Sequence, residues 1–184
     1  MPLNVPTYDT NQFSFGPGLL FLGASGATPT EDVGAITEDG IAFEITSEKK
    51  VITQGNPKIP IYPFSQAQGL MVRVTGIEWD FDDVAKILGA GSTTSGGGSD
   101  TFAFGGEPLV TQLALRVRHV MAPSGHTMFA NVWTCASEGG LSTAMNHDEH
   151  QFAHNYMALR STTDWASNTL AYTDQLFQFS RQTA

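Results

Sequence analysis

One stretch of the chain, Gly40 to Gly55, constrains the fold more than any other. Ile41, Phe43 and Ile45 alternate there with polar residues and alanine. This two-residue period is typical of a strand that buries one face and exposes the other. A second short β-prone piece, Val51 to Thr53, follows two lysines and leads into a turn. We therefore predict a long strand whose wet face is the working surface of the protein.

The composition favours a single, turn-rich β domain. The chain has 184 residues, of which 41% are hydrophobic, and this supports one core for a domain spanning 1–184. Its 19 glycines and 9 prolines favour many short strands over a helical bundle. From the local patterns we expect a strand at 19–23 that is buried on both faces, a strand at 68–77, a hairpin formed by 111–120 and 126–136, and a strand at 151–160.

The charge of the chain narrows the possible partners. The net charge is −9, whereas a surface that grips nucleic acid needs clustered Lys and Arg. An acidic surface can still meet DNA by repelling it and letting it slide. The single cysteine, Cys135, allows no intrachain disulfide, and we expect it to be a small buried hydrophobe. We find no secretory signal and no membrane span, and we expect the protein to be made in the cytoplasm.

Residues 81–88 form the one predicted helix. Asp80 is a good N-cap, and Gly89 stands where a left-handed C-cap would lie. Elsewhere the composition predicts less regular segments: an N-terminal arm at 1–15, a flexible Gly/Ser-rich loop at 89–101, and a C-terminal arm or strand at 170–184. Phe13 and Phe15 lie near the end of the N-terminal arm, where they can attach it to a neighbouring subunit.

A histidine-rich segment is the sharpest candidate for local chemistry. On a helix, His147, His150 and His154 would share one face and resemble a metal site. Gln151, however, stands where the related zinc-protease motif needs its general-base glutamate. The alternation that follows favours a loop entering a strand, with the histidines on a polar surface. We therefore assign no metal, no cofactor and no catalytic residue, and keep the three histidines as the candidates for a metal site.

The outward faces of the predicted strands carry most of the remaining information. Glu44, Thr46 and Glu48 lie on one strand, and Arg73, Arg116 and Arg118 lie on two others. These side chains are compatible with an ordinary solvated sheet. Opposite charges on neighbouring edges would equally allow identical subunits to pair side by side into a ring.

Taken together, several features of the chain follow one another in a characteristic order: Gly18–Gly23, the Thr28–Gly34 loop, Gly40–Glu44, the Gln54–Pro57 turn, the Trp79–Gly89 helix and Asn146–Leu159. In this order of features, which covers most of its length, the chain resembles the tail tube (major tail) proteins of long-tailed bacteriophages.

The resemblance implies a two-sheet β-sandwich or partial barrel with one flanking helix. Six copies would form a ring, and stacked rings would form a tube through which double-stranded DNA passes during genome ejection. Glu44, Thr46 and Glu48 would then face an acidic lumen, and Arg73, Arg116, Arg118, Phe13 and Phe15 would contact other subunits. The family has no catalytic residues. Its implied partners are further copies, the tape measure, the terminator and the baseplate or tip, in a virion assembled in the host cytoplasm.

Two other functions remain open at this point. The chain could be a related virion part, such as a tail terminator, a baseplate ring protein or a capsid decoration protein. It could also be a metal-binding enzyme that uses His147, His150 and His154.

Overall fold

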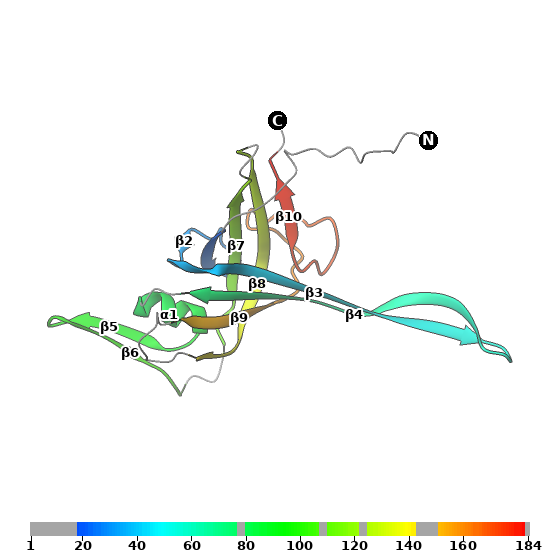
Figure 1. The fold of residues 1–184 in the computed structure, drawn as a ribbon, viewed down its shortest axis with the longest axis horizontal. Coiled ribbons are helices and arrows are strands. Elements are labelled where there is room, and N and C mark those ends of the chain that lie inside the picture. The colour runs from blue at the N-terminus through cyan, green and yellow to red at the C-terminus, as the bar shows by residue number, and fades with distance from the viewer. Residues whose placement is uncertain (1–17, 77–79, 107–109, 122–124, 143–150, 183–184) are drawn as a thin grey trace, which may run out of the picture.

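The structure, a computed structural model, describes residues 18–76, 80–106, 110–121, 125–142 and 151–182 (Figure 1). It is mostly β with one short helix, as the sequence predicts. The elements are β1 Leu19–Ala24, β2 Glu31–Asp32, β3 Ile36–Gln54, β4 Ile59–Gly76, α1 Phe81–Leu88, β5 Ser92–Gly96, β6 Ser99–Ala103, β7 Leu113–Val120, β8 Thr127–Ser142, β9 Phe152–Ala158 and β10 Gln178–Arg181.

The main sheet is antiparallel and has the strand order β2-β1-β7-β8-β9-β4-β3, with β10 also paired to β8. Strand β8 connects two layers because its two halves have different neighbours. Its first half lies between β7 and β10, whereas its second half, from Cys135 onward, pairs with β9. The sheet therefore folds back on itself, and Phe43 of β3 packs edge-to-face against Phe179 of β10, with ring centroids 5.3 Å apart. This arrangement is sandwich-like, as expected from strands that switch layers.

The core lies between these layers and consists of alternate residues from the central strands. Alternate residues of β4 (Leu70, Val72, Val74) and β7 (Leu113, Leu115, Val117) are all buried, and they pack with Leu20, Leu22, Val132, Cys135 and Tyr156. The prediction that the first strand is buried on both faces is wrong. Leu20 is 0% exposed but its neighbour Leu19 is 47% exposed, since β1 lies near the sheet edge with only one face covered.

Helix α1 has the predicted bounds and both predicted caps. The Asp80 carboxylate accepts a hydrogen bond from the backbone N–H of Asp82 at 2.9 Å. Gly89 has φ 63°, a left-handed conformation that glycine adopts without a steric cost. Val84 and Ile87 are buried and fix the helix to the core side of the molecule.

The expected irregular loop at 89–101 is instead part of a small antiparallel hairpin, β5–β6, which pairs Ser92 with Ala103 and Gly96 with Ser99. Gly97 and Gly98 form its two-residue turn with φ 62° and 82°. Turns of this kind need positive φ at both central residues, and this is why a Gly-Gly pair closes a tight hairpin. Gly97 and Gly98, which suggested a flexible loop, are therefore the turn residues of a regular hairpin.

Near the C-terminus, the strand alternative predicted for 170–184 is confirmed for β10, and Leu176 and Phe177 pack on the core just before it. Strand β9 has the predicted alternation, but its buried side includes His154 and Tyr156, while Ala153 and Met157 are exposed. The N-terminal arm predicted at 1–15 lies outside the described residues.

Candidate functional site

The most distinctive surface is a projecting hairpin formed by the outer parts of β3 and β4 (Figure 1). Every residue from Glu44 to Gln68 is exposed, and we call this segment the arm. Strand β4 pairs with β9 only from Met71 onward, and β3 is the last strand of the sheet order. Among the described strands, both edges of the arm are therefore unpaired.

The prediction of a long strand that buries one face along its whole length is wrong for the arm, because all its residues are exposed. Ile41 and Phe43 are half-buried and pack against the core, but Ile45 is 55% exposed and lines an open hollow between the base of the arm and residues 172–177. The piece from Val51 to Thr53 is not a separate strand but the end of β3. In the proline-rich segment 57–63, the residues from Ile59 onward form the start of β4.

Two irregularities in the β3–β4 register, after Glu48 and after Ile52, do not interrupt the pairing of the arm. Lys50 lies opposite Phe64, and Ile52 lies opposite Tyr62. Directly opposed residues of an antiparallel pair project from the same face of the ribbon. We call these four residues the outer strip: Lys50, Ile52, Tyr62 and Phe64. By alternation along β3, the outer strip shares a face with Glu44, Thr46 and Glu48.

Large apolar side chains are exposed along the arm, as is typical of a surface that contacts another protein. Besides the three apolar members of the outer strip they include Val51, Ile59, which is 62% exposed, and Ile61 on the returning strand. Residues 49–68 also contain three lysines and no acidic residue. Contiguous exposed apolar side chains are uncommon on a monomer and mark contact sites. This strip was not predicted, because residues 47–50 are polar on both faces of β3 and interrupt the apolar alternation before Val51 and Ile52.

The predicted lumen residues lie at the base of the arm and are all exposed. The carboxylate of Glu44 accepts hydrogen bonds from Nε and Nη2 of Arg73 at 3.1 and 2.5 Å. This ion pair compensates the charge of Glu44. Thr46 lies opposite Gly69, whose missing side chain leaves room for the Thr46 hydroxyl. Within the described part of the chain, Glu48 has no cationic partner, so it carries the uncompensated negative charge of this face.

The predicted subunit-contact residues fall into three groups. Arg116 has partners within the chain: its guanidinium stacks 4.6 Å from the Trp165 ring centroid and donates from Nε to Asn131 at 3.0 Å. Its contact with another subunit stays a prediction. Burial lowers the Arg116 pKa from its ordinary value. Arg73 forms an ion pair with Glu44. Arg118 is exposed on β7. Phe13 and Phe15 lie outside the described residues.

The candidate metal site is not assembled by the described residues. His147 and His150 lie outside them, and no three His, Cys, Asp or Glu side chains of the described ranges gather closely enough to hold a metal. His154 is buried, so the interpretation that it lies on a polar surface is wrong. Its Nδ1 lies 3.3 Å from the Phe152 carbonyl oxygen, and since a carbonyl only accepts, Nδ1 carries the proton. Its ring packs edge-to-face on Tyr156.

Burial also controls the ionisation of the buried side chains near His154. Desolvation lowers the His154 pKa to about 4, although the hydrogen bond to Phe152 opposes this shift. Desolvation raises the Cys135 pKa to about 12 and raises the Tyr156 pKa well above its ordinary value. The Cys135 thiol is therefore neutral at physiological pH and is not an activated nucleophile.

The buried His154 leads to a prediction about pH. Because its folded-state pKa lies below the unfolded value of 6.5, the unfolded chain binds the proton first as the pH falls. Stability should decrease between about pH 6.5 and pH 4, and His154 should account for about 3 kcal/mol of that decrease. Urea unfolding at pH 7 and pH 4 measures it. The neutral variant His154→Gln should lose distinctly less stability over this range, and an equal loss in both proteins would contradict the assignment.

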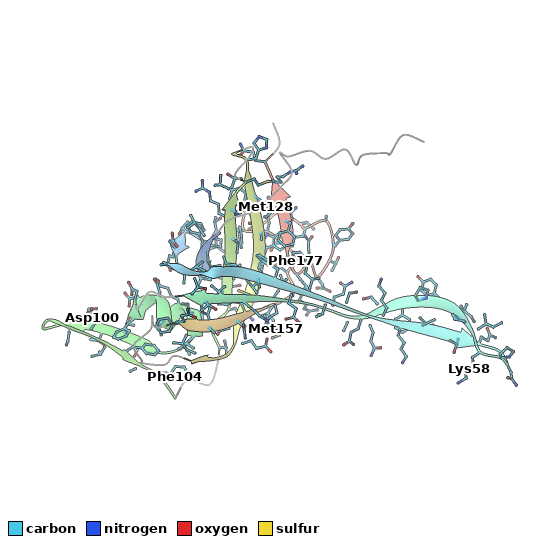
Figure 2. The ribbon with its side chains drawn as sticks, in the orientation of Figure 1. Lys58, Asp100, Phe104, Met128, Met157 and Phe177 are labelled. Atoms are coloured by element: carbon cyan, nitrogen blue, oxygen red, sulfur yellow. The ribbon has the colours of Figure 1, made fainter. Side chains whose placement is uncertain are left out.

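A second notable surface lies at α1 and the β5–β6 hairpin, at the opposite end of the molecule from the arm (Figure 2). Asp80, Asp82 and Asp100 surround a hollow of about 270 Å³ together with Phe81, Thr93 and Ser95. The Thr93 hydroxyl donates to Asp82 across this hollow. Phe81, Phe102 and Phe104 form a row with successive ring centroids 6.4 Å apart, and Phe104 is 67% exposed. We call this surface, made of the three aspartates and three phenylalanines, the acidic aromatic face.

None of the described helices is long and apolar enough to span a lipid bilayer. Neither a protein-family model nor a curated protein sequence matches this chain. The function is therefore inferred from the surfaces described above and from the resemblance of the sequence to tail tube proteins.

Proposed function

We propose that the protein is a structural subunit that assembles with copies of itself into stacked rings, and that these rings form the tail tube of a long-tailed bacteriophage. The observation that carries the proposal is the arm, a ribbon of two strands that is exposed on both faces and open at both edges. The resemblance of the sequence to tail tube proteins supplies the tube and its passage of DNA.

The arm supports self-assembly because a two-stranded ribbon is marginally stable in water on its own. Its unpaired backbone groups and exposed apolar side chains are both liabilities for a monomer. Contact with other subunits would pair or cover them. A long arm that is ordered against a neighbour therefore explains why residues with high β-propensity, such as Val51, Ile52 and Tyr62, occur where the chain has no core of its own.

The charged and polar residues at the base of the arm are consistent with a surface that lines a water-filled channel. Its negative charge is smaller than the sequence suggests. Glu44 and Arg73 compensate each other, so Glu48 supplies most of the negative field beside Thr46. The outer strip, on the same face further out, is too apolar for a channel that must release DNA. We therefore propose the lumen for the base of the arm and subunit contact for its outer half.

Analytical ultracentrifugation of the full-length protein tests self-assembly. The proposal predicts a concentration-dependent distribution dominated by species many times heavier than the 19.8 kDa chain. Native mass spectrometry of the smallest closed species should give the ring size, which we expect to be six. A protein that sediments as a monomer at every concentration would refute the proposal. Closed single rings that never stack would favour a terminator or baseplate ring instead.

The charge at the base of the arm gives a separate prediction about DNA passage. The double variant Glu44→Gln with Glu48→Gln leaves Arg73 uncompensated and turns this surface from net negative to net positive. Tubes should still form, but DNA delivery by particles carrying the variant should fall several-fold because phosphates are now attracted. Arg73→Gln makes the surface more negative and serves as the matched control, which should deliver DNA normally. Normal delivery by the double variant would exclude this face from the lumen.

A further inference from the structure

The two ends of the molecule carry complementary surfaces. The outer arm, residues 49–68, has a charge of +3 from Lys49, Lys50 and Lys58. The whole chain carries −9, so the remainder carries −12. The lysines of the outer arm accompany exposed aromatic and aliphatic side chains, among them Tyr62, which is 63% exposed.

The acidic aromatic face has the same kind of apolar content with the opposite charge. Asp82 and Asp100 are exposed beside the partly exposed row of phenylalanines. Among the described residues, the Asp100 carboxylate forms no ion pair and no side-chain hydrogen bond. Lys86, one helical turn after Asp82, is paired with Glu31 at 2.9 Å and with Asp83 at 3.9 Å. The positive ends of the lysine side chains and the aromatic faces of the phenylalanines also attract each other directly. The acidic aromatic face can therefore bind the outer arm in two ways: its aspartates pair with the lysines, and its phenylalanines contact the apolar side chains.

We infer that the outer strip of one copy docks on the acidic aromatic face of the next copy. This inference rests on the proposed self-assembly and names the surfaces that perform it. A second copy is the occupant that the observations favour, because each copy brings the complement of its own exposed surface. Lysines alone would also attract phosphate groups, but that partner leaves Ile52, Tyr62 and Phe64 uncovered.

The positions of the two surfaces determine the kind of assembly. Lys58 lies at the tip of the arm, whereas Asp100 and Phe104 lie at the other end of the molecule (Figure 2). Docking between different surfaces is head-to-tail, and such contacts close into rings or continue as filaments. The same contact in every subunit therefore generates an extended assembly from a single chain.

A reciprocal charge reversal tests the docking. The face variant carries Asp82→Lys and Asp100→Lys, and the arm variant carries Lys50→Glu and Lys58→Glu. Asp80 is left unchanged because it caps α1. In each variant alone, like charges meet at every contact, so the concentration needed for assembly should rise at least about tenfold. In an equimolar mixture every contact between unlike variants is complementary again, and assembly should return with the two chains alternating.

The mixture also shows that both variants are folded, since only folded subunits can rescue each other. Glu138→Lys, an exposed charge reversal on β8, is a control that should assemble like the unchanged protein. Loss in both variants with rescue in the mixture supports the inference. Normal assembly of either variant, or loss without rescue, overturns the docking but leaves the proposed function standing if the unchanged protein forms tubes. A monomeric unchanged protein overturns both.

Discussion

Replacing residues 49–66 with Asn-Gly should give a folded protein that no longer assembles. Glu48 and Ala67 are paired neighbours, so a two-residue turn can join them without changing the register of the remaining strands. The removed residues are all exposed and contribute nothing to the core. They include the outer strip, which we propose as the contact surface. The loss of assembly should therefore be complete, while the cooperative unfolding transition is retained.

Thermal unfolding and sedimentation velocity, measured on the same sample, check both parts of this result. Replacing Gly97-Gly98 with Asn-Gly is the matched control, since it substitutes the same dipeptide at the turn of the other projecting hairpin. That variant should fold and assemble like the unchanged protein. If the shortened protein still forms large assemblies, the arm is not the contact. If it loses its unfolding transition, the arm is part of the fold rather than an addition to it.

Leu20→Ala should lower the free energy of unfolding by about 2–5 kcal/mol, because it opens a cavity in a closely packed core. Leu20 is fully buried in β1, opposite Val117, between the two layers of the sheet. Its neighbour Leu19 provides an unusually close control. Leu19→Ala removes the same atoms from the half-exposed side of the same strand and should cost about 1 kcal/mol or less.

Urea unfolding of the two variants measures this difference. Under the fold described above, Leu20→Ala shifts the midpoint far more than Leu19→Ala does. Equal shifts would mean that both faces of β1 are covered, as the continuous apolar run of the sequence first indicated. The comparison is best made at pH 7, where His154 is neutral in the folded state and mostly neutral in the unfolded state.

Local patterns in the sequence predicted the elements whose structure depends on neighbours along the chain. Helix α1 was found from Asp80 and Gly89 because caps and apolar spacing are short-range features. The buried sides of β4 and β7 followed from their alternation. The β5–β6 hairpin was missed for the same reason, since a Gly-rich composition resembles a flexible loop until the pairing partner is known.

What lies opposite each strand face could not be predicted from local patterns. The alternation from Ile41 to Ile45 is the same whether or not the opposite layer packs against it, and only Ile41 and Phe43 pack on the core. Arg116 alternates with core residues like any surface arginine, yet it stacks on Trp165, which is distant in sequence. His154 stands in a polar segment but enters the core through β9. In each case the decisive contact is long-range.

The central claim is that this chain forms a hollow tube through its arm, and negative-stain electron microscopy of the purified full-length protein tests it most directly. We expect stacked rings with an open axial channel at concentrations where sedimentation shows large species, and only small particles for the protein with residues 49–66 replaced. Solid fibres without a channel, or single monomers for the full-length protein, would contradict the claim.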